Sequence, residues 1–178
     1  VLARLTVATD TEQRATTEVH LHILPKHLWE ADPDTTLLIE AEGLAGEGGG
    51  TSQLRTGRTN TSGAMVTFWD KDIGHWLEWE FNTPADGDYA VLLKYCTGSP
   101  SAIRDLQIDG VFPHQACRKI VFPGTGGFCK EADEWNYRSV QGADGEPLLF
   151  SLKAGRHRLR MSNLEGGMGL DYLLLIKR

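Results

Sequence analysis

Residues 75–96 read HWLEWEFNTPADGDYAVLLKYC and contain two alternating apolar segments on either side of a polar turn. In the first segment, every second side chain is large and apolar: Leu77, Trp79 and Phe81. The second segment alternates in the same way: Tyr89, Val91, Leu93 and Tyr95. Successive side chains of a strand point to opposite faces, so a period of two predicts strands with one buried face. Pro84–Gly87 supplies the residues of a turn that joins the two predicted strands.

Short apolar or alternating segments recur on both sides of these two predicted strands, separated by Gly, Pro, Asp and Ser. They span residues 37–42, 64–69, 104–109, 119–122, 147–152, 157–162 and 170–176. The last segment, LDYLLLI, is almost wholly apolar, as expected of a central strand buried on both faces. The glycine-rich stretch 43–50 is predicted to be a loop. Because no segment shows a convincing helical period, the sequence predicts an all-β sandwich or barrel.

The first 36 residues have a different organisation. Residues 1–25 predict a separate β-hairpin with a polar turn at 10–14, and they resemble the last two strands of an immunoglobulin-like domain. Residues 26–36 form a polar stretch without a clear period and are predicted to be a linker. The sandwich is therefore expected to span residues 37–178. We also expect the sequence to be part of a longer chain, because it starts inside a strand-like segment.

Charge and cysteine content narrow the partners and the compartment. The formal net charge is −6 and no Lys/Arg cluster stands out, which argues against a nucleic-acid partner. No apolar run approaches the roughly 18 residues of a membrane-spanning helix. Cys117 and Cys129 flank a Gly-rich loop, so they predict either one disulfide in an oxidising compartment or, together with Cys96, three free thiols.

Acidic side chains occur inside two of the apolar strands. Glu40 and Glu42 are two positions apart, so their carboxylates leave the same face of one strand, and Asp171 lies within the apolar last strand. Unpaired charges are costly in such surroundings. A calcium ion, which takes six to eight oxygen ligands, would neutralise all three carboxylates. Solvated strand-edge charges and salt bridges to arginine are the alternatives.

Seven motifs, taken in order, resemble carbohydrate-binding modules of families 6 and 35. They are IEAE, FWDKDIGHWLEWEF, PADGDYAVLLKY, LQIDG, FPGTGGF, FSLKAGRHRLRM and GGMGLDYLLLI, and they cover about residues 37–178. The resemblance implies a β-jelly-roll sandwich of two antiparallel sheets that attaches to polysaccharide-active enzymes. It also implies that Glu40, Glu42 and Asp171 bind a structural calcium ion.

In these families, aromatic side chains in the loops at one end of the sandwich stack on sugar rings. The resemblance places this role on Phe68, Trp69, Phe128, Trp135 and Tyr137, although Phe68 and Trp135 could instead be ordinary core residues. Many members carry an asparagine just before the closing aspartate, where this chain has Met168 and Gly169. Asn163 is the candidate replacement for that sugar contact. The loop 124–137 also contains an insertion relative to the family pattern.

The sequence carries none of the enzyme signatures that we searched for: a nucleophile elbow, a phosphate loop and a His-Glu-x-x-His motif are all absent. Glycosidases need two carboxylates across a cleft, and no pair stands out among several acidic residues. We therefore predict a secreted or cell-surface, non-catalytic module that binds a polysaccharide or oligosaccharide beside a catalytic domain of the same chain. The alternatives are an interaction domain without sugar binding and a polysaccharide lyase sandwich.

Overall fold

The computed structural model describes residues 2–8, 14–20 and 36–178. The chain divides into two compact units, Val1–Glu30 and Ala31–Arg178. In the first unit, β1 (Leu2–Ala8) pairs antiparallel with β2 (Arg14–His20), with Leu2 opposite His20. The predicted linker 26–36 lies outside the described residues except for Thr36, which begins the next strand. Residue 1, residues 9–13 with most of the predicted turn, and residues 21–25 of the first hairpin prediction also lie outside them.

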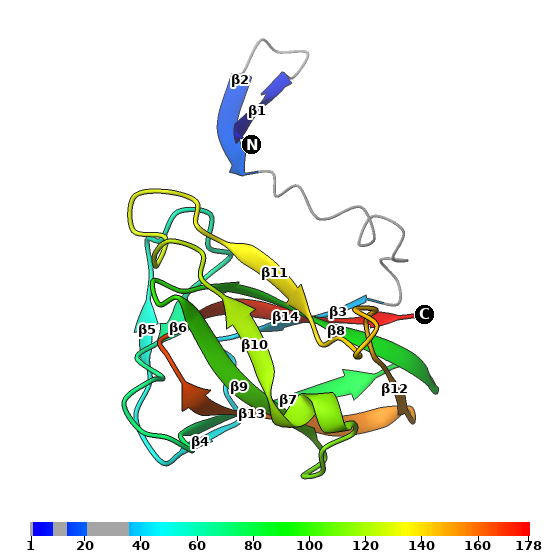
Figure 1. Ribbon diagram of the computed structural model, residues 1–178. Helices are drawn as coiled ribbons and strands as arrows, with labels where there is room; N and C mark the ends of the chain where they lie inside the picture. Colours follow the sequence, from blue (N-terminus) through cyan, green and yellow to red (C-terminus); the bar gives the residue numbers. More distant parts are fainter. Residues whose placement is uncertain (1, 9–13, 21–35) are drawn as a thin grey trace. The chain divides into compact units, whose positions relative to one another are not determined.

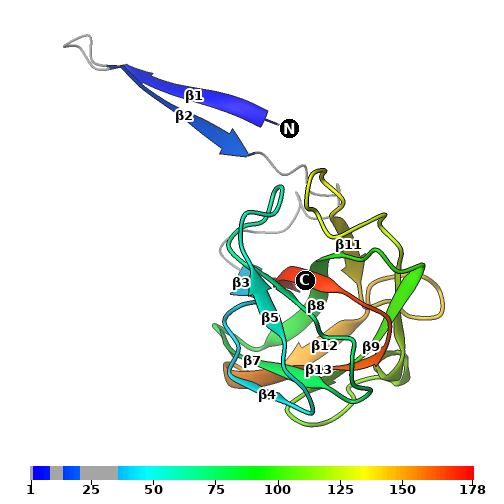
Figure 2. The ribbon, with the colours of Figure 1, turned by 90° about the vertical axis from the view of Figure 1, so that its left-hand side faces the viewer.

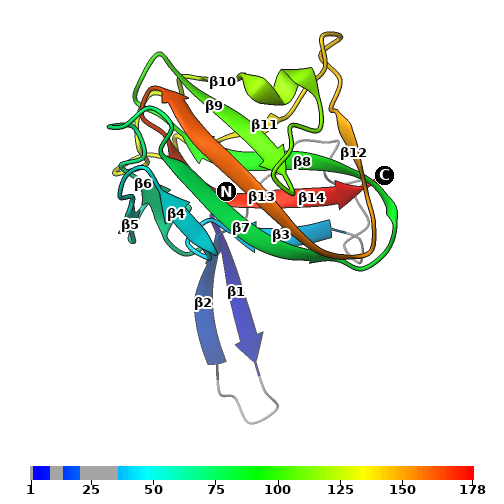
Figure 3. The same cartoon turned by 90° about the horizontal axis from the view of Figure 1, so that it is seen from below.

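The second unit is a sandwich of two antiparallel sheets (Figure 1). One sheet has five strands, in the order β10 (Ile120–Pro123), β9 (Ser101–Ile108), β13 (Gly155–Glu165), β7 (Trp76–Thr83) and β4 (Gly46–Gly48). Figure 3 looks onto this sheet, with the second sheet behind it. The all-β sandwich predicted from the sequence is therefore confirmed.

The second sheet has seven strands around a central β14 (Gly169–Lys177). Its main order is β11 (Asn136–Ser139), β8 (Gly87–Cys96), β14, β6 (Met65–Thr67) and β5 (Gln53–Arg55), while β12 (Leu149–Leu152) pairs with β8 and β3 (Thr36–Glu40) pairs with β14. Figure 2 shows the two sheets from the side. The strand predicted to be central, residues 170–176, is part of β14 and is buried along most of its length.

The core lies between the sheets and follows the predicted alternation. Leu77, Trp79 and Phe81 of β7 point inward and are at most 8% exposed. The inward side chains of β8, from Tyr89 to Tyr95, join the same cluster. The Trp79 indole N–H also donates a hydrogen bond of 2.9 Å to the Ala41 carbonyl of the opposite sheet. The periodicity of residues 75–96 thus identifies the inner faces of both sheets.

The glycine-rich stretch predicted to be a loop contains a strand instead. Residues Gly46–Gly48 form β4 and pair with β7, with Gly48 opposite Trp76. A Cβ atom added to Gly48 would lie 2.7 Å from the Trp76 ring, so the indole occupies the space that a side chain would need. Glycine is unfavourable in isolated strands, but here it admits an aromatic ring against the backbone. The short strands β5 and β11 are not among the segments predicted from the sequence.

Helical structure in the described part of the second unit is limited to one 3₁₀ turn, η2 (Gln115–Arg118), before β10. Across residues 2–8, 14–20 and 36–178, no helix has the length and apolar character needed to cross a bilayer.

Candidate functional site

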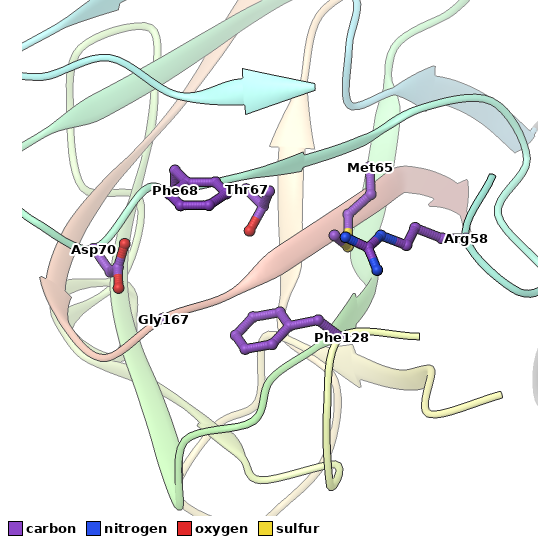
Figure 4. A pocket seen from close by; sticks show the side chains of 7 residues that line it. All are labelled: Arg58, Met65, Thr67, Phe68, Asp70, Phe128 and Gly167. Carbon is purple, nitrogen blue, oxygen red and sulfur yellow. The ribbon is translucent and has the colours of Figure 1, made fainter. Parts of the chain in front are cut away.

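A hollow of about 240 Å³ opens at the end of the sandwich where β6 runs into the following loop. It is lined by residues of three separate segments: Arg58, Met65, Thr67, Phe68, Asp70, Phe128 and Gly167. Figure 4 shows the Phe68 and Phe128 rings on opposite sides, with Asp70 toward one end and Arg58 toward the other. A Cβ atom added to Gly167 would lie 3.3 Å from the Asp70 carboxylate and 3.4 Å from the Phe128 ring. Bare backbone at Gly167 therefore keeps the space between these two side chains open.

The backbone at the end of β6 decides which side chains face the hollow. Phe68 has a φ of 59°, an uncommon value for a residue other than glycine. After this turn Phe68 is 38% exposed and Asp70 is also exposed, while Trp69 between them is buried. Unusual backbone conformations of this kind concentrate at functional sites. Arg55 lies 5.0 Å from the centre of the Phe68 ring and supports that ring by a cation–π contact.

Arg104 holds two walls of the hollow together from inside the protein. Its side chain is fully buried, and its guanidinium donates hydrogen bonds of 3.0 Å to the Trp69 carbonyl and of 2.8 and 2.9 Å to the Glu165 and Gly166 carbonyls. The guanidinium also lies 4.5 Å from the centre of the Trp69 ring. Burial lowers the Arg104 pKa to about 9, although the nearby Asp70 carboxylate partly opposes that shift. Arg104 thereby fixes the backbone beside Asp70 and Gly167.

Two of the predicted sugar-binding residues are in the wrong place for that role. Trp69 is 0% exposed, and its indole N–H donates a hydrogen bond of 2.7 Å to the His75 carbonyl. Asn163 is 1% exposed, and its amide donates a hydrogen bond of 2.9 Å to the Asp72 carbonyl. Neither side chain lines the hollow, so the structure does not bring Trp69 or Asn163 to the site as predicted. Trp69 and Asn163 instead stabilise the loop 69–75 from below.

Trp135 and Tyr137 are half-buried and do not line the hollow. The Trp135 indole N–H donates a hydrogen bond of 2.8 Å to the Thr59 carbonyl, which ties the loop after β10 to the loop before β6. The Tyr137 hydroxyl lies 3.2 Å from that of Tyr172, and burial is the main cause of the raised pKa of both phenols. Of the five predicted aromatic residues, the structure brings only Phe68 and Phe128 to the hollow.

Sequence reasoning missed Arg58, Met65, Thr67 and Gly167 at this site and did not single out Asp70. Asp70 follows two aromatic residues at the end of a predicted strand, which is a weak signal for a site. Arg58 and Gly167 reach the hollow from loops far apart in the sequence, so no local pattern indicates them.

The three carboxylates predicted to bind calcium all reach one short segment, Ser62–Ala64. The Ser62 hydroxyl lies 2.7 Å from Glu40 Oε2 and 3.2 Å from Asp171 Oδ1, and the Ala64 N–H donates a hydrogen bond of 2.9 Å to Glu42 Oε1. The Ser62 hydroxyl has a single hydrogen, so it cannot donate to Glu40 and Asp171 at the same time. The structure thus places all three carboxylates in contact with the same short segment.

A lysine that the sequence analysis did not consider is part of this group. Lys94 and Asp171 are both completely buried, and Lys94 Nζ lies 2.7 Å from Asp171 Oδ2. The ammonium also donates a hydrogen bond of 2.6 Å to the Asn60 carbonyl and lies 5.0 Å from the centre of the Trp135 ring. The expectation that an ion alone balances the carboxylates is thus incomplete, because Lys94 balances one of them.

The chemistry and net charge of Glu40, Glu42, Asp171 and Lys94 together would suit a calcium ion. Three carboxylates and one ammonium leave two formal negative charges, and the buried Oε2 atom of Glu42 has no hydrogen-bond partner. Carboxylate oxygens are the ligands that calcium prefers. Among residues 36–178, however, no three His, Cys, Asp or Glu side chains form a group that could hold a metal as they stand. Calcium binding would therefore require these side chains to converge further.

The cysteines do not form the bridge considered from the sequence. All three thiols are free and buried. Cys117 belongs to the main core between the sheets, whereas Cys129 packs with Cys96 and Met65 in a separate cluster. The pairing of Cys117 with Cys129 is wrong, because the loop after β10 carries Cys129 away from η2 and toward the end of β8.

No family model and no curated protein sequence matches the chain, but solved structures match its fold. A family 35 carbohydrate-binding module from Clostridium thermocellum aligns with a TM-score of 0.63 at 20% identity, over 80% of this chain and 98% of its own. This chain has the fold of a carbohydrate-binding module. The module CBM6cm-2 of Cellvibrio mixtus lichenase 5A, solved with cellotriose, aligns with a TM-score of 0.55 at 20% identity. That alignment covers 80% of this chain and 97% of the module.

The same fold also occurs as part of a larger enzyme chain. The GH26-CBM35 β-(1,4)-mannanase of Podospora anserina aligns with a TM-score of 0.60 at 17% identity, over 82% of this chain and 28% of the mannanase. The jelly-roll fold that the motif resemblance implied is thereby confirmed.

Proposed function

We propose that the sandwich is a non-catalytic module that binds a sugar ring in the hollow between Phe68 and Phe128. The observation that carries this proposal is the combination of two aromatic rings with an acid and a guanidinium around one open space. Its volume of about 240 Å³ suits one sugar ring rather than an enclosed oligosaccharide. The carbohydrate-binding fold supports the same conclusion.

Binding would combine an apolar and a polar contribution. The C–H faces of a sugar ring would cover Phe68 and Phe128, which removes apolar surface from water. Asp70 accepts hydrogen bonds from hydroxyl groups, and Arg58 donates to ring or hydroxyl oxygens. The Arg55 contact and the positive φ of Phe68 hold that ring in place before the ligand arrives, which reduces the entropy lost on binding.

Removing either ring should weaken glycan binding. We expect Phe68→Ala and Phe128→Ala each to raise Kd by about tenfold, because each loses one stacking surface. A glycan array identifies the ligand, and isothermal titration calorimetry then measures Kd for each variant. Leu149→Ala is the matched control, because Leu149 is similarly exposed, at 49%, but does not line the hollow. Unchanged Kd in both phenylalanine variants would reject this site.

We further propose that a calcium ion binds at Glu40, Glu42 and Asp171 and stabilises the sandwich. The support is the two residual negative charges and the unpartnered Glu42 Oε2 atom. The ion would join β3 to β14 through their side chains, next to the Lys94 ammonium. It would supply structure rather than chemistry, since these residues do not line the hollow.

Chelation provides the test of the calcium site. A hundredfold excess of calcium over Kd stabilises by about 2.7 kcal/mol, so chelator should lower Tm by roughly 5–10 °C. Glu42→Gln should abolish this shift, since the amide oxygen can still accept from Ala64 but carries no charge. Glu80→Gln, on the outer face of β7, should keep it. An equal Tm in calcium and in chelator would contradict the proposal.

Finally, we propose that the module is secreted or displayed at the cell surface, as an accessory to a catalytic domain of the same chain. The mannanase that contains a similar module supports this arrangement. Its polysaccharide or oligosaccharide partner would then be the substrate of that catalytic domain.

A further inference from the structure

Two thiols lie together beneath one side of the hollow. Cys96 ends β8, and Cys129 lies in the loop between β10 and β11, next to Phe128. Both are 0% exposed and form one cluster with Met65, which itself lines the hollow. Within this buried cluster the Cys96 Sγ atom is 3.5 Å from Met65 Sδ. Neither thiol takes part in the proposed sugar or calcium site.

The loop that carries Cys129 is built to present this side chain inward. Cys129 has a φ of 54°, an uncommon value for a residue with a side chain. Its N–H donates a hydrogen bond of 2.8 Å to Glu134 Oε2, and its carbonyl accepts one of 2.9 Å from the Thr59 N–H. These two bonds hold the backbone while the side chain points toward the end of β8.

We propose that Cys96 and Cys129 form a disulfide when the protein folds in an oxidising compartment. The bridge would fasten the loop of Phe128 to the central sheet, and the inference does not depend on sugar binding. Glutathione disulfide is a sufficient oxidant. The first thiolate attacks it and releases one glutathione, and the second thiolate attacks the mixed disulfide and releases another. The two cysteines lose two protons and two electrons, and the oxidant is reduced to two glutathione molecules.

Packing favours this pair over the other combinations, because Cys96 and Cys129 share one buried cluster. The interaction between the two thiols lowers the pKa of Cys129 and raises that of Cys96, so Cys129 supplies the first attacking thiolate. Cys117 lies in the main core between the sheets, in a different cluster from Cys96 and Cys129. Cys117 is therefore expected to remain reduced.

Thiol counting after refolding tests the proposal. The full chain is refolded in a glutathione redox buffer, unfolded in denaturant and alkylated, and its intact mass is measured. One alkylated cysteine, Cys117, is expected in the wild type, and three after prior reduction. Cys117→Ser should then show none when oxidised, and Cys96→Ala should show two. Peptide mapping should recover one linked pair that contains Cys96 and Cys129. Three alkylated cysteines in the refolded wild type, or a linked peptide that contains Cys117, would overturn the proposal.

Thermal stability gives a second readout. The bridge would close a loop of 34 residues, from 96 to 129. Reduction of the wild type should lower Tm by roughly 5–10 °C, because the unfolded chain regains its freedom. The Cys96→Ala/Cys129→Ala variant should show no such dependence on reductant. An equal Tm for oxidised and reduced wild type would show that the bridge does not fasten the loop.

Discussion

Replacing Arg104 by alanine is expected to lower the free energy of unfolding by about 3–5 kcal/mol. The substitution empties a fully buried volume and leaves carbonyls of Trp69, Glu165 and Gly166 without their donor. Chemical denaturation of the wild type and the variant measures the difference. Because the same carbonyls flank the hollow, glycan binding should weaken together with stability.

Arg158→Ala is the matched control for Arg104. Arg158 is 57% exposed and pairs with Glu80 at 2.7 Å on the outer face of the five-stranded sheet. Exposed ion pairs contribute about 0–1 kcal/mol, so this variant should remain close to the wild type. Equal losses in both variants would contradict the role given to Arg104.

The second large effect is expected at Lys94. Lys94→Met keeps most of the side-chain volume but leaves the buried Asp171 carboxylate without its cation, which should cost about 3–5 kcal/mol of stability. Adding Asp171→Asn to this variant should recover part of the loss, since the uncompensated charge is then removed. Both measurements use chemical denaturation in chelator, so that calcium does not contribute.

Lys153→Met serves as the control for Lys94. Lys153 Nζ lies 2.8 Å from Asp86 Oδ2, close to the 2.7 Å between Lys94 and Asp171. The Lys153 and Asp86 side chains are, however, 86% and 61% exposed. Solvent screening makes such a pair nearly neutral for stability. A loss below about 1 kcal/mol for Lys94→Met would show that the buried pair is not needed.

The alternation of residues 75–96 predicts the inner faces correctly because the inward side chains of β7 and β8 all pack into the core between the sheets. The same parity also indicates that Asn163 is buried, since it shares a face with Leu159 and Met161 of β13. The resemblance to a family outweighed this local signal and led to the wrong role for Asn163.

Other features could not be read from a local pattern. Lys94 lies on the outer face of β8, where alternation predicts exposure, but the loop at Asn60 and the Trp135 ring cover it. The choice between Phe68 and Trp69 depends on the positive φ of Phe68, which no spacing predicts. The strand Gly46–Gly48 exists because an indole lies over it, and that contact joins residues far apart in the sequence.

The hydrogen bonds of Arg104 to the loops at this end of the sandwich do not depend on the side chains of those loops. All the bonds that it makes there go to main-chain oxygens, which every amino acid possesses. Substitutions at exposed positions of the hollow such as Phe68 and Asp70 therefore leave the acceptors of these hydrogen bonds in place. The scaffold could consequently be given new ligand preferences by randomising the rim alone, as long as the buried guanidinium is retained.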